Sequence, residues 1–271
     1  MQRDIDALVE FKNSQEYWEL LNWLTPLDSG EQQNNLQQRR VPETGNWFIR
    51  LEKFKNWINE PQTKLLCLGM PGAGKSFIAS IVIEHLQNMF PPDQGVGIAY
   101  LFCDFNLRHE QRPEGLLGSL LKQLMQKRAV PRDLQKLFDR HRSRPPGRRP
   151  LINEIYTWLR TATAIYSRVF IVIDALDECD SAVRTTFLDK IFKLHSRTRL
   201  NILATSRFVQ EIIGIFEECI STLHVIEIQA NEDDVQRFLD SKILEGFRFV
   251  RQEKDLREYV QKEIGAAVRG M

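Results

Sequence analysis

The chain has 271 residues, of which 42% are hydrophobic, so it is long enough to bury a core without disulfides or metal ions. Its 37 Lys and Arg residues nearly balance its 36 Asp and Glu residues, which gives no reason to expect nucleic acid or an acidic membrane surface as the main partner. Its apolar runs are shorter than a signal peptide or a membrane span requires, so we expect a soluble protein of the cytoplasm.

The first part of the chain predicts two helices separated by a polar stretch. Ser14 can cap the first helix, in which Tyr17 and Leu24 share one face, and Pro26 stops it. Residues 28–45 are rich in Gln, Asn and Arg, and we interpret them as a linker or a surface-hugging arm. The second amphipathic helix is predicted at residues 50–59.

Strands and helices then alternate to the end of the chain. Strands are predicted at residues 65–68, 96–105, 169–173, 200–204 and 223–228. Helices are predicted at residues 77–89, 115–127, 134–138, 152–165, 183–194 and 209–216, after a cap at Asn231 or Asp233, and at 256–268. Alternation of this kind predicts a parallel sheet with right-handed crossovers and helices on both faces.

A basic run and the cysteines are two further features that bear on function. The basic, Pro-broken run from Arg140 to Arg149 is either a nuclear-import or polyanion patch or a solvated loop, and we favour the loop. The cysteines are scattered without a C-x-x-C pair, and most lie in or beside apolar runs. Buried reduced thiols are therefore expected rather than disulfides or zinc ligands.

The segment GMPGAGKS follows the first predicted strand and opens a helix, and it fits the pattern G-x-x-x-x-G-K-[ST]. Its glycines let backbone N–H groups approach an anion, Lys75 brings a positive charge to the β- and γ-phosphates, and Ser76 offers a hydroxyl to Mg²⁺. The alternative is an ordinary Gly-rich turn. The residues expected to bind the nucleotide are Gly69, Met70, Pro71, Gly72, Ala73, Gly74, Lys75, Ser76 and Phe77.

Polar residues follow two other predicted strands, where ligand sites of such sheets lie. Asp174 ends the strand at 169–173 and is expected to hold Mg²⁺ opposite Ser76, although a turn aspartate is the alternative. Asp177 or Glu178 can orient or deprotonate the attacking water; alternatively, both form an acidic cap on the next helix. Arg207, after the strand at 200–204, can contact the γ-phosphate or form a structural ion pair.

GMPGAGKS, VFIVIDALDEC and LNILATSR together resemble the three signatures of a NACHT NTPase. This module belongs to the STAND class, the signal-transducing branch of the P-loop ATPases and GTPases. The runs LLNWLTPLDSGEQQ and TGNWF are similar to fungal NOD-like receptors, in which ankyrin or WD repeats often follow the NACHT module. The resemblance covers nearly the whole chain.

The resemblance implies a three-layer α/β/α P-loop fold with a five-stranded parallel sheet. In that sheet the strand at 200–204, which leads to Arg207, would lie between the strand at 65–68, which leads to Gly69, and the strand at 169–173, which leads to Asp174. It implies a helical arm at residues 1–45, the NTPase domain at 46–230 and the start of a helical domain at 231–271. It also implies Mg²⁺, ATP or GTP, self-association, and roles for Asp177, Glu178 and Arg207 in catalysis. Because the chain ends at Met271, a fragment of a longer receptor and a reduced protein are both open.

Faster ATPases of this sheet order place glutamate directly after the Mg²⁺-binding aspartate, whereas this chain has Ala175. We therefore expect slow hydrolysis, with the bound nucleotide acting as a switch of fungal innate immunity or heterokaryon incompatibility. Binding without hydrolysis is the first alternative, and a small-molecule P-loop kinase is the second. The base is undetermined: Thr44 to Trp47 can pack near adenine or guanine, and Trp47 is equally an ordinary core residue.

Overall fold

The computed structural model describes residues 15–126, 135–136, 138–140 and 149–246 of the chain. Ser14, the predicted helix at 256–268 and nearly all of the basic run at 140–149 lie outside the described residues. Of the helix predicted at 134–138, residues 135, 136 and 138 are described, and they are helical.

The centre of the fold is a five-stranded parallel sheet in the order β2-β3-β4-β1-β5. The strands are β1 (Lys64–Leu68), β2 (Val96–Phe102), β3 (Arg168–Asp174), β4 (Leu200–Ser206) and β5 (Leu223–Glu227). Strand β4 lies between β1 and β3, as expected. Strand β2 ends three residues before the predicted Phe105, because the chain turns there into the short 3-10 helix Phe105–Leu107.

The register brings the carboxyl ends of the strands to one edge. Leu68, the last residue of β1, is opposite Ser206 of β4 and Glu227 of β5. Asp174, the last residue of β3, is opposite Phe102 of β2. The loops that follow β1, β2, β3 and β4 therefore begin side by side.

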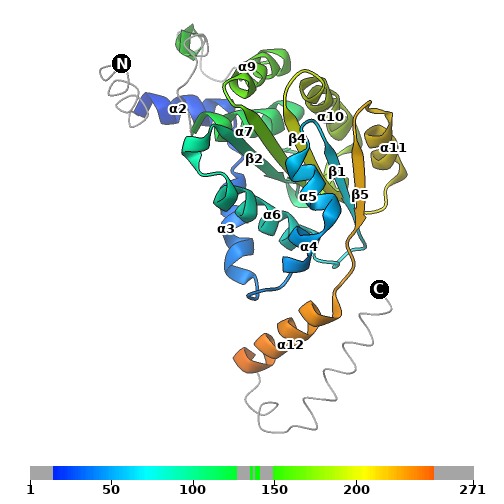
Figure 1. Ribbon diagram of the computed structural model, residues 1–271. Coiled ribbons are helices and arrows are strands. Elements are labelled where there is room, and N and C mark those ends of the chain that lie inside the picture. Colours follow the sequence, from blue (N-terminus) through cyan, green and yellow to red (C-terminus); the bar gives the residue numbers. More distant parts are fainter. Residues whose placement is uncertain (1–14, 127–134, 137, 141–148, 247–271) are drawn as a thin grey trace, which may run out of the picture.

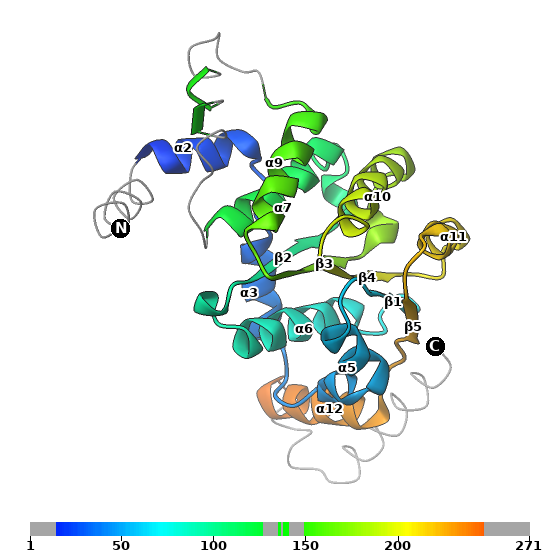
Figure 2. The same ribbon diagram turned by 45° about the horizontal axis from the view of Figure 1, so that its top comes forward.

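Helices cover both faces of the sheet and make three layers (Figures 1 and 2). One face carries α5 (Glu52–Asn59) and α6 (Lys75–Met89), and the other carries α7 (Pro113–Gln126), α9 (Ile152–Ala164), α10 (Ser181–His195) and α11 (Gln210–Glu218). The remaining helices are α2 (Gln15–Leu24), α3 (Ser29–Arg39), α4 (Asn46–Arg50) and α12 (Glu232–Gly246). The predicted α/β/α architecture is confirmed.

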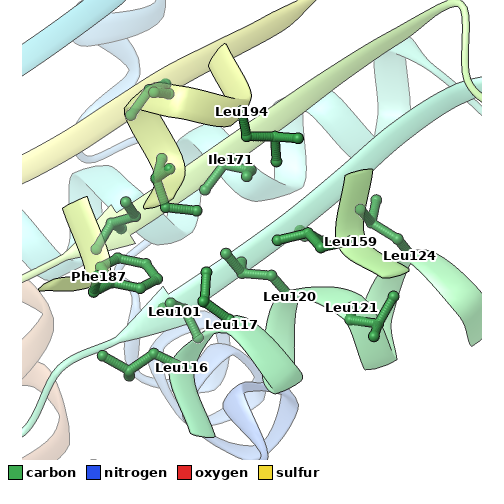
Figure 3. Close-up of a cluster of buried hydrophobic side chains, with 14 of the residues drawn as sticks. Leu101, Leu116, Leu117, Leu120, Leu121, Leu124, Leu159, Ile171, Phe187 and Leu194 are labelled. Atoms are coloured by element: carbon green, nitrogen blue, oxygen red, sulfur yellow. The ribbon is translucent and has the colours of Figure 1, made fainter. Parts of the chain in front are cut away.

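Strand β3 is apolar along most of its length because both of its faces are buried. Ile171 points into the leucine-rich cluster beneath α7, α9 and α10 (Figure 3), whereas Phe170 and Val172 belong to the cluster beneath α5 and α6. Because side chains alternate along a strand, a strand covered on both faces must be apolar at nearly every position. The only buried carboxylate of β3 is at its end, Asp174.

The interpretation of residues 28–45 as a linker is wrong for most of that stretch, whereas the alternative of an arm lying on the surface of the domain agrees with the structure. Residues 29–39 form α3, which packs on α6. Asp28 caps the helix by accepting a hydrogen bond from the N–H of Gly30 at 2.8 Å, and the buried Gln33 donates from Nε2 to the carbonyl of Ser80 at 3.0 Å. A polar side chain replaces the apolar contact that periodicity detects, so the helix was missed.

The cysteines agree with the expectation of reduced, mostly buried thiols. All four cysteines are free thiols, and Cys67, Cys103 and Cys179 are buried. Among the described residues, no helix is both long enough and apolar enough to cross a membrane.

We predict that Asp28→Ala lowers the free energy of unfolding by about 1 kcal/mol, because the first turn of α3 loses its side-chain acceptor. Asp28→Asn is the matched control, since asparagine caps helices about as well as aspartate. Urea unfolding followed by circular dichroism measures both variants. Equal midpoints for Asp28→Ala and the wild type would show that α3 does not depend on this cap.

Candidate nucleotide-binding site

The loop between β1 and α6 has the backbone geometry of an anion cradle. Gly72 and Gly74 have φ angles of +81° and +89°, which only glycine adopts without strain. A Cβ atom at either residue would meet no atom within 4 Å, so open space lies beside the loop. Gly69 is needed for a different reason: a Cβ atom there would lie 2.5 Å from the carbonyl oxygen of Ile228.

Lys75 begins α6 and folds back over this loop. Its Nζ donates hydrogen bonds to the carbonyl oxygens of Gly69 at 2.8 Å and Met70 at 2.9 Å. Burial lowers the pKa of Lys75, and the nearby carboxylates of Asp177 and Asp174 oppose that shift. The Lys75 ammonium therefore lies at the loop, next to the N-terminus of α6, which is the positive end of the helix dipole.

Asp174 lies beside the loop, only 3% exposed. Its carboxylate is hydrogen-bonded by the hydroxyls of Ser76 and Thr205, and the Thr205 Oγ1 donates to Oδ1 at 2.6 Å. Burial raises the pKa of Asp174, and these two hydrogen bonds oppose the shift. Asp174 and Ser76, the two residues expected to hold Mg²⁺, are thus adjacent in the structure, and their role as magnesium ligands stays a prediction.

Ser76 and Asp174 suit a magnesium ion that is shared with a nucleotide. They offer a hydroxyl and a carboxylate on one side of the loop, which are ligands that Mg²⁺ accepts. Within the described part of the chain, no group of three or more His, Cys, Asp or Glu residues can hold a metal ion. Ser76 and Asp174 would fill only part of a coordination shell, which phosphate oxygens and water would complete.

Thr205 is a site residue that the sequence interpretation did not single out. Besides donating to Asp174, its Oγ1 accepts the N–H of Ala175 at 2.9 Å. Ala175 has a left-handed backbone, with φ 55° and ψ 48°, a conformation that costs a residue with a side chain about 1 kcal/mol or more. The Thr205 hydroxyl thus fixes both the Asp174 carboxylate and the turn that follows it.

Asp177 and Glu178 are adjacent in sequence but contact different strand ends. Asp177 reaches toward β4, where it accepts from the backbone N–H of Arg207 at 3.0 Å and from its Nε at 2.6 Å. Glu178 reaches toward β2: its Oε2 accepts from the N–H of Phe105 at 3.1 Å, and its carbonyl accepts from Arg108 Nε at 2.9 Å. The two carboxylates are therefore not equivalent.

A polar cavity of about 650 Å³ opens on the Glu178 side of the site. Ser76, Asp174 and Glu178 line it, and Asp177 does not. Its other walls are the start of α3 and the residues just after β2. Of the two candidate carboxylates, Glu178 is the one that shares a space with the predicted magnesium ligands.

A second, mainly apolar cavity of about 510 Å³ lies on the other side of the loop. Its walls come from the loop and α6, from the segment that leads into α4, and from α12 with the residues before it. The lining residues are Gly72, Ala73, Gly74, Phe77, Ile78, Ile81, Arg39, Val41, Thr44, Gly45, Trp47, Gln229, Ala230, Asn231, Asp234, Val235, Phe238 and Leu239. Met70 and Pro71 line neither cavity. A mainly apolar space beside a phosphate cradle suits a nucleobase.

Polar contacts are made at the wall of this second cavity and just behind it. Asp234 of α12 accepts from the N–H of Gly45 at 2.8 Å and from Trp47 Nε1 at 3.0 Å. Arg40 donates to the carbonyl of Thr44 and to Oδ1 of Asn46. Asp234 therefore attaches α12 to the wall opposite, and Trp47 lines the cavity while it also packs against the core beneath α5 and α6. Neither contact is visible as a local sequence pattern.

Comparison with known proteins places this site in a family. The family model described as Nephrocystin 3, N-terminal, matches residues 43–207, which is more than half of the chain. The matched segment begins just before α4, ends at Arg207, and includes the loop, Asp174, Asp177 and Glu178. No curated protein matches the chain.

Solved structures share the fold at low sequence identity. The structure of Orc1 from Aeropyrum pernix in complex with DNA has a TM-score of 0.52 and 15% identity, over 76% of this chain and 50% of that one. Cdc6p from Pyrobaculum aerophilum has a TM-score of 0.46 and 14% identity, over 82% and 52%. A DNA replication initiation factor has a TM-score of 0.46 and 13% identity, over 87% and 61%. The chain thus spans about half to three fifths of these proteins, and the likeness to Orc1 supports the P-loop fold alone.

We predict that Asp174→Asn raises the free energy of unfolding at pH 7, without nucleotide, by about 0.5–2 kcal/mol. A carboxyl whose pKa is raised by folding stabilises the protein fully below its unfolded pKa, about 3.9 for aspartate, and this stability is lost as pH rises through the folded pKa. The advantage of asparagine should therefore shrink as pH falls.

Urea midpoints measured between pH 4 and 8 test this prediction. Asp93→Asn makes the same charge change at an exposed position and serves as the control, which should leave the pH dependence unchanged. A lower stability of Asp174→Asn than of the wild type at pH 7 would contradict the account.

Proposed function

This chain belongs to the Nephrocystin 3, N-terminal, family, and from that premise we propose that it binds ATP or GTP with Mg²⁺ and hydrolyses it slowly as a conformational switch. The observation that carries the proposal is the convergence of three features on one loop. Lys75 lies over the loop, Ser76 and Asp174 meet beside it, and a cavity of about 510 Å³ adjoins it.

The phosphates would be held by the N–H groups of residues 69–76 and by Lys75. The Lys75 ammonium now contacts the carbonyls of Gly69 and Met70, and a phosphate oxygen within its reach would add a charge-assisted hydrogen bond. Bound magnesium would neutralise charge on the β- and γ-phosphates. Ser76 and Asp174 would orient that ion, with Thr205 holding the Asp174 carboxylate in place.

The base and ribose would occupy the second cavity, between Phe77 and the segment from Thr44 to Trp47. Its lining is mainly apolar, which suits the face of a purine. Because Asp234 joins α12 to Gly45 and Trp47 across this cavity, a bound nucleotide would touch both the fixed wall and the helix. Binding of a nucleotide in the cavity would thereby change the position of α12.

Glu178 would orient or deprotonate the attacking water, because it faces the cavity that Ser76 and Asp174 share. Asp177 would instead hold Arg207, to which it is joined by a 2.6 Å ion pair. A γ-phosphate would compete with Asp177 for the guanidinium of Arg207. The left-handed Ala175 takes the position of the glutamate of faster ATPases, which supports slow turnover.

Switching would follow from the third phosphate. Changing a 1:99 mixture of two conformations into 99:1 requires about 5.5 kcal/mol of differential binding. Contacts of one γ-phosphate with Lys75, Arg207 and Mg²⁺ are of sufficient strength, since a hydrogen bond to a charged group contributes about 1.5–3 kcal/mol. We propose that triphosphate and diphosphate favour different positions of α12 and that self-association follows the triphosphate state.

We further propose the finer assignment to NACHT modules of the STAND class, as in fungal NOD-like receptors, on the strength of GMPGAGKS, DALDE and TSR. The division into residues 1–45, 46–230 and 231–271 remains part of this proposal. The free thiols of all four cysteines suit the reducing interior of a cell, where we place the protein.

Lys75→Ala should weaken the binding of MgATP or MgGTP by about 100-fold, because two or more charge-assisted contacts with phosphate are lost. Lys193→Ala is the matched control, since Lys193 forms only an exposed ion pair with Asp189. Titration with a fluorescent nucleotide measures the affinity, and circular dichroism verifies the fold. Equal affinity of Lys75→Ala and the wild type would remove the loop from the proposed site.

Glu178→Gln should lower the rate of phosphate release by about 100-fold or more while leaving nucleotide affinity within about twofold, because only the water loses its base. Asp177→Asn should instead raise the preference for triphosphate over diphosphate by about three- to tenfold, because Arg207 is released for the γ-phosphate. Single-turnover phosphate release and competition titrations separate the two effects. The roles are wrong if Asp177→Asn abolishes release and Glu178→Gln does not.

A further inference from the structure

Two of the free thiols meet at the edge of the site. The Sγ atoms of Cys103 and Cys179 lie 3.3 Å apart, and the two residues are only 6% and 2% exposed. Cys103 follows β2, and Cys179 follows the turn that contains Glu178. The other cysteines lie elsewhere, Cys67 within β1 and Cys219 directly after α11.

The two sulfur atoms are close enough for a disulfide bond to form after a small movement. An S–S bond measures about 2.05 Å, so the two sulfur atoms need to approach by little more than about 1 Å. Cys103 also lines the polar cavity of about 650 Å³ beside Ser76 and Asp174. That cavity gives a molecule the size of water a route from solvent to the Cys103 side of the pair.

We propose that Cys103 and Cys179 form a reversible redox site in which a peroxide converts the two thiols to a disulfide. One sulfur, as the thiolate, attacks a peroxide oxygen, so that the O–O bond breaks and a sulfenic acid and hydroxide form. The second sulfur displaces the sulfenic hydroxyl and loses its proton. The sum is two thiols and hydrogen peroxide giving one disulfide and two waters, and a small dithiol reverses it by exchange.

The disulfide would join two loops that already hold Glu178. Phe105, two residues after Cys103, donates its N–H to the Glu178 carboxylate, and Arg108 donates to the Glu178 carbonyl. Cys103 donates its own N–H to the carbonyl of Asp174 at 3.0 Å. A covalent bond at this point fixes the Glu178 turn against the end of β2. Because the role of Glu178 rests on the proposed function, lower phosphate release is the consequence only where that function holds.

The test exposes the purified chain of residues 1–271 to hydrogen peroxide in molar steps, blocks remaining thiols with N-ethylmaleimide under denaturing conditions, and digests it with trypsin. The expected product is peptide 76–108 joined to peptide 169–184, two hydrogens lighter than their sum and separated by dithiothreitol. Cys67, in peptide 65–75, should carry maleimide throughout. Hydrogen exchange of residues 104–108 and 176–180 should slow on oxidation.

Two variants keep the test decisive. Cys179→Ala should abolish both the joined peptide and the slower exchange, whereas Cys219→Ser should leave both unchanged. Where the reduced protein releases phosphate, oxidation should lower that release by at least about fivefold in the wild type and not in Cys179→Ala. Maleimide on both Cys103 and Cys179 after oxidation, a sulfinic acid at either, or a joined peptide containing Cys219 would overturn the redox site, whatever the nucleotide measurements show.

Discussion

The arrangement of this edge of the sheet depends on one buried carboxylate. Asp174 is 3% exposed, and a buried charge is tolerated only when it is hydrogen-bonded or paired. Its donors come from two different elements, Ser76 at the start of α6 and Thr205 near the end of β4. In the strand order β3-β4-β1, the strand that carries Thr205 lies between the strand that ends at Asp174 and the strand that leads into the loop. Thr205 and Ser76 can therefore both reach the Asp174 carboxylate.

The turn after Asp174 is held by contacts with the ends of both neighbouring strands. Thr205 and Arg207 connect it to the end of β4, while Phe105 and Arg108 connect it to the segment after β2. Five backbone or side-chain contacts therefore hold a turn that contains a left-handed alanine. Such preorganisation costs stability in the free protein and favours function, which is the usual compromise at binding sites.

Strong local patterns made much of this structure predictable. The inner strands β1, β3 and β4 are predictable because a strand buried on both faces is apolar at almost every position, and the loop because its glycines and lysine have a fixed spacing. Helix α3 was missed because Gln33 makes its buried contact through an amide. The different partners of Asp177 and Glu178 were also beyond prediction, because they depend on which strands lie on either side of β3 in space.

The second cavity likewise depends on a contact that no local sequence pattern predicts. Trp47 and Asp234 are 187 positions apart in sequence and meet only in the fold, so neither composition nor periodicity indicates their hydrogen bond. The contact joins the part of the chain that precedes the loop to the helix that follows β5. A nucleotide lying between them would therefore connect recognition of the base to the position of α12.

The claim at the centre of this account is that the loop and both adjoining cavities hold one nucleoside triphosphate. Denaturing the purified chain after incubation with MgATP or MgGTP, removing free ligand, and quantifying the released nucleotide tests it most directly. The account predicts close to one purine nucleotide per chain for at least one of the two. Retention of neither nucleotide, at millimolar concentration and with the fold intact, would contradict it.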